Sequence, residues 1–238
     1  MTRTLIGIGV GPGDPDLVTL GAIKAIEKAD LALLPLSKEG GNSVAGGIVK
    51  GHVDRDWVSL VFPMKGREDE RDETILTQLE EIRPLWEKAE TVVLPVIGDS
   101  TLYATVAWLY EQWKKLDPDM KLKLIPGISA HALAASRTSR FLAMGEERLS
   151  ILPGTASFSD LQESLRHTDC AAIYKPSALG EELQRLVGST GPWDEMVRIV
   201  KAGLPEEEIS IGQDALSPCE NYLSILLLRR KGSEATSL

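Results

Sequence analysis

The stretch Thr4-Leu5-Ile6-Gly7-Ile8-Gly9-Val10-Gly11-Pro12-Gly13-Asp14-Pro15 decides the fold. Its first six residues form a continuous apolar run, which is typical of a strand covered on both faces of a parallel sheet. The glycines that follow allow the backbone to approach a ligand closely, and a helical pattern begins directly after them. The stretch therefore predicts an α/β fold with a ligand-binding turn after its first strand.

The alternation of short apolar runs and helical patterns continues along the first half of the chain. We predict strands at Thr4–Gly9, Leu31–Leu36, Asp56–Phe62, Thr91–Ile97 and Lys121–Ile125. Helical patterns separate them at Asp16–Ala29, Gly46–Gly51, Arg71–Lys88 and Thr101–Leu116. Because strands and helices alternate, the sheet of this half is expected to be parallel.

After about Ile125 the pattern changes. A predicted helix at Ala130–Arg137 is followed by strands at Leu149–Leu152, Ala171–Tyr174, Met196–Lys201 and Tyr222–Arg229, with helical patterns at Asp160–Arg166 and Leu179–Leu186. The final strand alternates less with helices and predicts an antiparallel or mixed sheet. We therefore expect two α/β lobes, residues 1–126 with a parallel sheet and residues 127–238 with a mixed one.

Composition narrows the class of function. The net charge is −9 and the chain lacks a basic stripe, which disfavours nucleic-acid binding. No apolar run is long enough to span a bilayer, the first residues do not form a secretion signal, and Cys170 and Cys219 lie far apart. A cytoplasmic protein with unpaired cysteines, acting away from membranes, is the expectation.

Metal and nucleophile chemistry have little support in the sequence. His52, His131 and His167 are scattered, with no cysteine or carboxylate at metal-ligand spacing. Surface or helix-capping roles are expected for all three, and no metal site is predicted. No Ser/His/Asp constellation stands out, so catalytic residues are left unassigned.

Two further motifs follow predicted strands. Gly98-Asp99-Ser100-Thr101-Leu102-Tyr103 comes after the fourth strand, where parallel-sheet enzymes place ligand sites. Asp99 can accept hydrogen bonds from a ligand, and Ser100 or Thr101 can cap the next helix. Pro126-Gly127-Ile128-Ser129-Ala130 follows the fifth strand, with Ser129 as a plausible cap. Alone, the motif at Gly98 fits a ligand site and a simple helix cap equally well, whereas the motif at Pro126 favours an ordinary turn.

The glycine-rich first turn also has a different interpretation, as the dinucleotide site of a nicotinamide-dependent oxidoreductase. Pro12 and Pro15 remove two N–H donors that a phosphate would need, and the second strand ends in Leu33-Leu34-Pro35-Leu36 with no acidic residue to hold a ribose. A nicotinamide-dependent oxidoreductase therefore remains an alternative, although these residues support it less well.

Taken together, the three glycine-containing turns resemble the tetrapyrrole methylases that use S-adenosylmethionine. That family carries G-x-G-P-G-x-x-x-L-L-T, then G-D-P-x-x-Y, then P-G-x-S-S. The chain departs from the pattern at Ser100, where proline is usual, and at Ala130, where the second serine is usual. Within the family, Val61–Met64, Gly145–Gly154 and the ending Tyr222–Ile225 look most like the branch that methylates precorrin-2 or cobalt-precorrin-2 at C20.

The resemblance covers essentially the whole chain and implies the two-lobed fold of class III methyltransferases, with the active site in a cleft between the lobes. It implies S-adenosylmethionine as cofactor, S-adenosylhomocysteine as product, and a homodimer. The implied cofactor-binding residues are Pro12, Gly98, Asp99, Thr101, Tyr103, Ser129, Ala130, Tyr174, Ala202 and Leu223.

The implied tetrapyrrole substrate carries several carboxylates, whereas the protein is acidic. Positive charge must then be focused locally. The candidates are basic residues flanking strand-end loops, namely Lys65, Arg67, Arg71 and Arg148, with Arg137 and Arg140 beside them. Methylation at another ring position or of a protein substrate such as diphthine, and a non-catalytic tetrapyrrole carrier, remain as alternatives.

Overall fold

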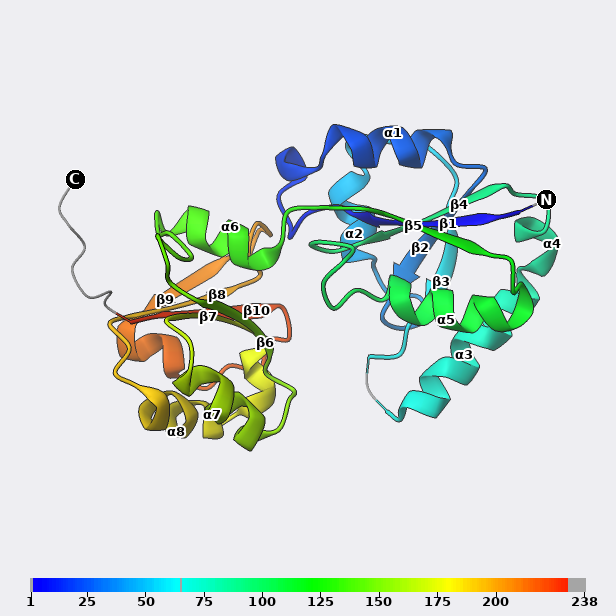
Figure 1. Ribbon diagram of the computed structural model, residues 1–238. Coiled ribbons are helices and arrows are strands. Elements are labelled where there is room, and N and C mark those ends of the chain that lie inside the picture. The colour runs from blue at the N-terminus through cyan, green and yellow to red at the C-terminus, as the bar shows by residue number, and fades with distance from the viewer. Residues whose placement is uncertain (1, 65, 231–238) are drawn as a thin grey trace. The chain divides into compact units, whose positions relative to one another are not determined.

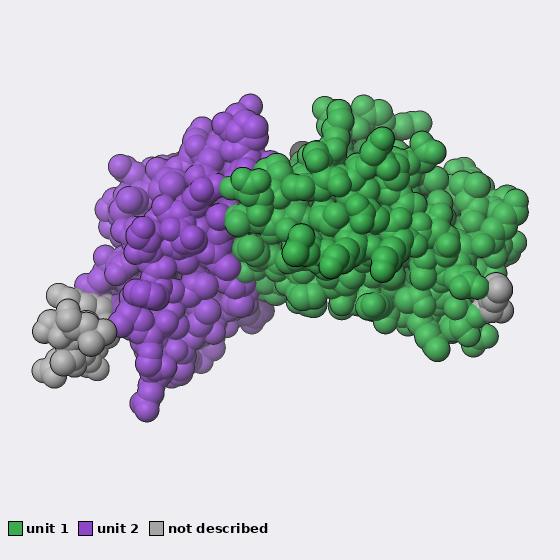
Figure 2. Space-filling model, turned by 90° about the horizontal axis from the view of Figure 1, so that it is seen from above, with its two compact units in different colours: residues 1–129 green, residues 130–238 purple. Residues whose placement is uncertain are grey.

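The structure is a computed structural model that describes residues 2–64 and 66–230. The chain divides into two compact units, Met1–Ser129 and Ala130–Leu238 (Figure 2). The boundary we predicted at residue 126 falls between the last strand of the first unit, which ends at Ile125, and the first helix of the second, which begins at Ala130.

The first unit is built on a five-stranded parallel sheet in the order β3-β2-β4-β1-β5 (Figure 1). Its strands are β1 (Thr4–Gly9), β2 (Leu31–Leu36), β3 (Val58–Val61), β4 (Thr91–Val96) and β5 (Lys121–Ile125). The parallel sheet predicted for this half is confirmed. In the register, Ile8 of β1 lies opposite Pro95 of β4 and Ile125 of β5, so these three strands end at one edge.

Helices cover both faces of this sheet. They are α1 (Leu20–Lys28), α2 (Val44–Val49), α3 (Glu68–Glu81), α4 (Arg83–Trp86) and α5 (Val106–Leu116), with a 3₁₀ turn, η1 (Pro15–Leu17). One core contains Leu5 and Leu94 from the strands with Leu79 and Leu109 from α3 and α5. A second core contains Ile8 with side chains of α1 and α2. The continuous apolar runs of the strands are explained by this burial on both faces.

Three predicted helices of the first unit are shorter than expected. The helix predicted at Asp16–Ala29 is divided into η1 and α1, because Val18 and Thr19 are extended and Thr19 is the N-cap of α1. The helix predicted at Thr101–Leu116 begins only at Val106, because Tyr103 has a φ of 51°, a left-handed conformation that no α-helix accepts. The helix predicted at Arg71–Lys88 is divided into α3 and α4 beside Pro84, whose ring lacks an N–H and collides with the preceding turn.

The second unit contains a mixed five-stranded sheet in the order β6-β7-β10-β8-β9. The mixed sheet predicted for this half of the chain is confirmed. Its strands are β6 (Leu149–Pro153), β7 (Cys170–Tyr174), β8 (Glu195–Val200), β9 (Glu208–Ile211) and β10 (Ser224–Arg229). Strands β6 and β7 are parallel, whereas β10 runs antiparallel to both β7 and β8. Consequently the carboxyl ends of β7 and β8 meet the amino end of β10 at one edge.

Helices α7 (Phe158–Arg166) and α8 (Glu182–Thr190) pack on one face of this sheet, where they share a core with Ile173 and Leu226. Helix α6 (Ala130–Arg137) contacts β10, and two 3₁₀ turns complete the unit, η2 (Pro176–Leu179) and η3 (Gly212–Leu216). Strand β9 and the turn η3 were not predicted. Among the described residues, no helix is long and apolar enough to cross a membrane.

Candidate functional site

The three glycine-containing loops of the first unit meet at the carboxyl edge of its sheet. Gly11 and Gly98 form an antiparallel bridge: the Gly11 N–H donates to the Gly98 carbonyl at 3.1 Å, and the Gly98 N–H donates to the Gly11 carbonyl at 2.7 Å. The loops after β1 and β4, far apart in sequence, are thereby held together by backbone groups alone. This arrangement follows from the parallel register of the strands.

The third loop packs against the first two without room for a side chain. A Cβ atom on Gly127 would lie 2.4 Å from the Gly98 carbonyl oxygen and 2.6 Å from the Gly9 carbonyl carbon. A Cβ atom on Gly9 would lie 2.5 Å from the Gly127 nitrogen. Glycine is required at both positions because the backbones touch, and not because of their own φ angles.

Asp99 joins two of these loops through its carboxylate. One oxygen accepts hydrogen bonds from the backbone N–H and hydroxyl of Thr101, and the other accepts the Gly127 N–H at 3.2 Å. The sequence predicted Asp99 and Thr101 as cofactor ligands; the structure shows that both also fix the shape of the loop. The capping roles predicted for Ser100 and Thr101 are wrong, since the N-cap of α5 is Thr105.

Ser100, which stands where the family pattern has proline, is buried and donates a hydrogen bond from its hydroxyl to the Ile125 carbonyl at 2.8 Å. This bond ties the loop after β4 to the end of β5. The serine therefore adds a tertiary contact at a position where proline would only restrict the backbone.

We expect Ser100→Ala to lower the free energy of unfolding by about 1–3 kcal/mol, because the Ile125 carbonyl loses the hydrogen bond donated by the buried Ser100 hydroxyl. Affinity for S-adenosylhomocysteine should fall in the same variant. Thermal unfolding and calorimetric titration measure the two effects. Ser59→Ala on the exposed side of β3 is the matched control and should leave both quantities unchanged.

The three loops form a surface, here called the glycine floor, that is made of the backbone around Gly9, Gly11, Gly98 and Gly127. This surface leaves space for a ligand at Gly98. Gly98 has a φ of 73°, and no atom lies within 4 Å of the position that a Cβ would occupy. Tyr103, five residues on, is 44% exposed, and desolvation raises the pKa of its hydroxyl, which stays neutral at physiological pH. A non-glycine residue held at a φ of 51° next to an open backbone surface is the kind of strain found at ligand sites.

Three of the four residues predicted as cofactor contacts in the second unit gather at one edge of its sheet, and the fourth, Ala130, begins α6. Tyr174 ends β7, Ala202 follows β8, and Leu223 precedes β10. The Lys201 N–H donates to the Leu223 carbonyl at 2.7 Å, which connects the loop after β8 to the start of β10. Lys175, directly after Tyr174, likewise donates its N–H to the Ser224 carbonyl at 3.1 Å.

His131, for which a surface or capping role was expected, makes a tertiary contact that the sequence did not indicate. Its side chain is half-buried, and its Nδ1 lies 2.7 Å from the Tyr174 hydroxyl. The partner lies 43 residues away along the chain, so no local spacing could have identified the pair. His52 and His167 are exposed, as expected. Among the described residues, no group of three or more side chains could hold a metal ion.

Five of the basic residues proposed to bind an acidic substrate already face carboxylates. The ion pairs are Arg67–Asp69, Arg71–Asp72, Arg137–Glu207, Arg140–Glu195 and Arg148–Asp169. Arg71 also stacks on the Trp108 ring, 4.2 Å from its centroid. Lys65 lies outside the described residues. An acidic substrate would therefore compete with internal carboxylates for these guanidinium groups.

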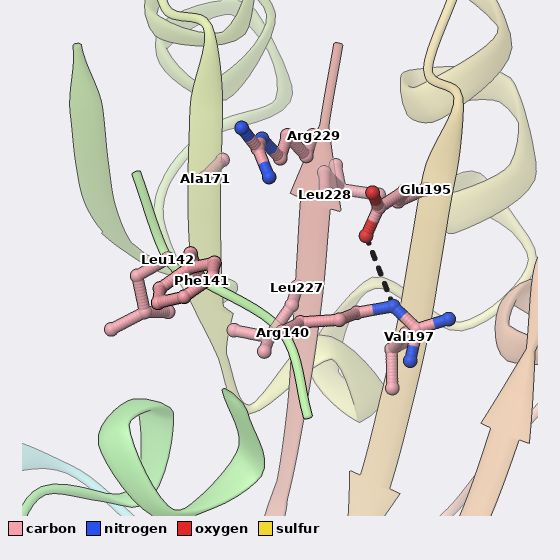
Figure 3. Close-up of a pocket in the computed structure, with 9 residues that line it drawn as sticks. All are labelled: Arg140, Phe141, Leu142, Ala171, Glu195, Val197, Leu227, Leu228 and Arg229. Atoms are coloured by element: carbon pink, nitrogen blue, oxygen red, sulfur yellow. Dashed lines mark hydrogen bonds and ion pairs between the residues drawn. The ribbon is translucent and has the colours of Figure 1, made fainter. Parts of the chain in front are cut away.

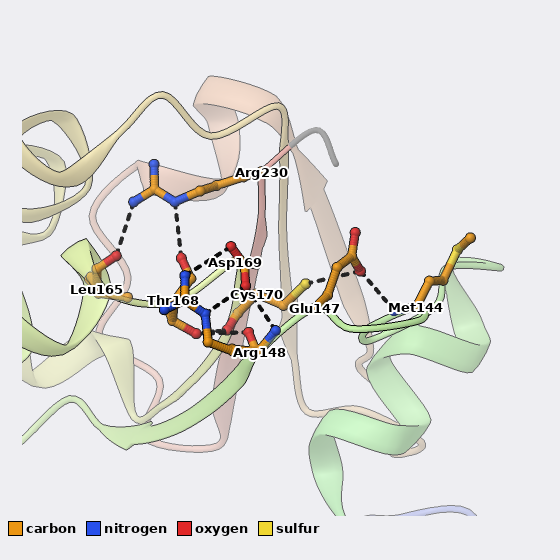
Figure 4. A network of polar contacts seen from close by, with 8 residues as sticks. All are labelled: Met144, Glu147, Arg148, Leu165, Thr168, Asp169, Cys170 and Arg230. Atoms are coloured by element: carbon orange, nitrogen blue, oxygen red, sulfur yellow. Dashed lines mark hydrogen bonds and ion pairs between the residues drawn. The ribbon is translucent and has the colours of Figure 1, made fainter. Parts of the chain in front are cut away.

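Arg148 lies at the amino end of β6, whereas Tyr174 lies at the carboxyl end of the parallel neighbour β7. The Arg148 guanidinium and the Arg148 backbone N–H both donate to the Asp169 carboxylate, each at 2.9 Å (Figure 4). Next to this pair, Glu147 faces Arg229 at 2.8 Å and accepts a contact from the Cys170 thiol. Arg148 thus belongs to a polar network at the opposite edge from the predicted cofactor contacts.

This network makes the free energy of unfolding depend on pH. The hydrogen bonds from the Arg148 side chain and N–H lower the pKa of Asp169 from 3.8 to about 2. Because the folded-state pKa is the lower one, the stabilising contribution is complete above the ordinary pKa and is lost as the pH falls toward 2. The unfolding temperature of wild type should therefore exceed that of Asp169→Asn near neutral pH, and the difference should shrink through this window. A pH-independent difference would contradict the assignment.

Two recesses lie in the second unit, and neither favours an acidic tetrapyrrole. The smaller, about 20 Å³, lies between the loop carrying Phe141 and the strands β7, β10 and β8, and it is large enough for a single water (Figure 3). The larger, about 450 Å³, is lined by Glu206, Glu208 and Glu220, while its Lys201 is paired with Glu206. Three carboxylates make this recess unfavourable for a polyanionic substrate.

Comparison with known proteins identifies relatives along nearly the whole chain. The family model described as Tetrapyrrole (Corrin/Porphyrin) Methylases matches residues 4–213. A probable cobalt-precorrin-2 C(20)-methyltransferase of Methanocaldococcus jannaschii is 31% identical over 97% of both chains. A precorrin-2 C(20)-methyltransferase of a Sinorhizobium species is 27% identical over 94% of both.

The fold is also found among solved structures. Uroporphyrin-III C-methyltransferase from Thermus thermophilus, complexed with S-adenosylhomocysteine, superimposes with a TM-score of 0.66 at 18% identity, covering 95% of this chain and 97% of that one. The fold class predicted from the sequence, a two-lobed α/β methyltransferase with a parallel and a mixed sheet, is confirmed.

Proposed function

The chain belongs to the tetrapyrrole methylase family, and from this premise we propose that it transfers the methyl group of S-adenosylmethionine to C20 of precorrin-2 or cobalt-precorrin-2. The family uses S-adenosylmethionine, so the nicotinamide-dependent alternative is set aside. The C20 position is supported by the names of the two relatives described above, which match over nearly their full lengths.

The observation that carries this proposal is the glycine floor of the first unit. When bound, S-adenosylmethionine supplies an electrophilic methyl group. The chain's contribution is to orient it, through the loops that the Gly11–Gly98 bridge and Asp99 hold in one shape. The proposed contacts from this unit are Pro12, Gly98, Asp99, Thr101, Tyr103 and Ser129. From the second unit we propose Ala130, Tyr174, Ala202 and Leu223.

The acceptor is an acidic tetrapyrrole, and we propose that it binds beside the start of α3, where Arg67 is the N-cap and Arg71 lies about one turn further on. Lys65, the third candidate, lies outside the described residues. Arg67 is the most accessible of the described members, with a side chain 75% exposed, and its partner Asp69 is also exposed. An exposed ion pair is held weakly, so a substrate carboxylate can replace Asp69 at little cost. We further propose that the protein acts as a homodimer.

The test is a methyl-transfer assay with anaerobically prepared precorrin-2, with and without cobalt, followed by mass spectrometry and carbon NMR. One new methyl group at C20 would establish the reaction, and its metal dependence would identify the natural acceptor. A methyl group at another carbon would confirm tetrapyrrole methylation but would contradict the proposed C20 position. Absence of transfer, in a protein that binds S-adenosylhomocysteine, would require a different acceptor.

A further inference from the structure

The larger recess of the second unit, about 450 Å³, is lined by a buried arginine. Arg198 lies on β8 and is only 7% exposed. Its Nη1 donates to the Ser217 carbonyl, whereas its other guanidinium nitrogens have no hydrogen-bond partner and no ion pair within the described part of the chain. A buried guanidinium is costly unless an anionic group neutralises it. The recess beside Arg198 is therefore a place for an anionic group that the protein itself does not supply.

Two carboxylates that line the same recess form no ion pair with a described residue. Glu208 lies opposite Val200 in the register of β8 and β9, two residues along from Arg198, so these three side chains point to one face of the sheet. Glu220 lines the recess from the segment before β10. The third carboxylate, Glu206, is already in an ion pair. The recess thus presents one positive and two negative groups to a ligand.

The acidic groups of the recess do not converge on one point. Among residues 2–64 and 66–230, no group of three or more acidic, cysteine or histidine side chains could hold a metal ion. Separate positive groups on one molecule therefore match these carboxylates better than a single metal ion does. Val200 and Pro218 add apolar surface to the lining, against which an aliphatic chain can lie.

We propose that this recess binds an amino acid with a basic side chain, which places its carboxylate on Arg198 and its two ammonium groups on Glu208 and Glu220. The volume lies within the range of about 300–1,000 Å³ that small-molecule sites occupy. A carboxylate on a guanidinium is among the strongest pairs available to a small ligand. The site lies wholly within residues 198–221 of the second unit and does not depend on the proposed methyl transfer.

Calorimetric titration of the full chain with three probes tests this pattern of charge. L-ornithine carries the carboxylate and both ammonium groups, L-norvaline lacks the side-chain ammonium, and putrescine lacks the carboxylate. Because a hydrogen bond to a charged group contributes about tenfold or more, L-ornithine should bind at least about tenfold more tightly than either other probe. Equal affinity for all three, or no binding of L-ornithine at millimolar concentration, would show that the recess holds only water and would overturn the proposal.

Variants of the lining residues assign each contact. Arg198→Met should weaken L-ornithine binding at least about tenfold, because the ligand carboxylate loses its partner. The ligand-free variant should keep or exceed the unfolding temperature of wild type, since a buried charge without an ion pair is removed. In the double variant Glu208→Gln/Glu220→Gln, the advantage of L-ornithine over L-norvaline should disappear. Arg185→Met, at an exposed arginine of α8, is the matched control and should bind as wild type does. Unchanged L-ornithine binding by Arg198→Met would overturn the proposal.

A competition titration separates this site from the proposed cofactor site. Lys201 lines the recess and precedes Ala202, a proposed cofactor contact. L-ornithine should bind with unchanged affinity when the protein is saturated with S-adenosylhomocysteine. Displacement of one ligand by the other would assign the recess to the cofactor and would overturn a separate site. Failure of S-adenosylhomocysteine to bind would contradict the proposed cofactor alone, because the three-probe titration does not use it.

Discussion

Gly127→Ala should lose at least about 100-fold in affinity for S-adenosylhomocysteine, since a shift of about 1 Å in a binding loop has effects of this size. The new Cβ would stand 2.4 Å from the Gly98 carbonyl oxygen and 2.6 Å from the Gly9 carbonyl carbon. Both neighbours are backbone atoms, so no side chain can rotate away. The loops after β1, β4 and β5 must separate, and overpacking of this kind also costs about 1–3 kcal/mol of unfolding free energy.

Calorimetric titration with S-adenosylhomocysteine measures this loss, and circular dichroism shows whether the variant is folded. Gly47→Ala is the control, because Gly47 is an exposed residue of α2 with nothing within 4 Å of its Cβ position. That substitution should stabilise the helix by up to about 1 kcal/mol and leave affinity unchanged. A folded Gly127→Ala protein with wild-type affinity would show that the three loops do not form the cofactor site.

Trp86→Ala should lower the free energy of unfolding by about 3–5 kcal/mol, the usual cost of removing a fully buried tryptophan. Trp86 is 1% exposed, its Nε1 donates to the Leu79 carbonyl at 2.7 Å, and its ring meets Trp113 edge to face with centroids 5.4 Å apart. The substitution removes this packing and leaves the Leu79 carbonyl without its donor. Denaturant titration measures the change.

A matched pair of substitutions separates the hydrogen bond from the packing. Trp113 is equally buried, but its Nε1 has no hydrogen-bond partner within the described part of the chain. Trp86→Phe loses a made bond, whereas Trp113→Phe removes an unsatisfied donor, so Trp86→Phe should be the more destabilising of the two. Equal losses would mean that packing alone determines the contribution of Trp86.

Strands β1 and β2 could be predicted to the residue, as Thr4–Gly9 and Leu31–Leu36, because each is a largely buried apolar run. The bounds of the edge strand β5 also agree with the predicted Lys121–Ile125, although this strand is largely exposed. The edge strand β9 was missed because its four residues alternate charged or polar with apolar side chains and are largely exposed. Short edge strands bury too little to leave a strong pattern.

The site was predictable where it depends on topology and not where it depends on distant side-chain contacts. Motifs after parallel neighbours must meet at one edge, so the convergence of the glycine loops followed from the strand assignments. The bond from Gly127 to Asp99 spans 28 residues, and the contact of His131 with Tyr174 spans 43. Neither contact can be predicted from the spacing of residues along the sequence. The left-handed Tyr103, which delays α5, is equally invisible.

The bridge between Gly11 and Gly98 uses only main-chain atoms, and this has an evolutionary consequence. A support made of peptide groups and glycine hydrogens does not depend on the identity of the side chains around it. Substitutions in the surrounding loops can therefore alter which acceptor is methylated while the surface that we propose for the methyl donor persists. The fold itself is shared at 18% identity with the Thermus thermophilus structure, so a scaffold of this kind tolerates extensive substitution.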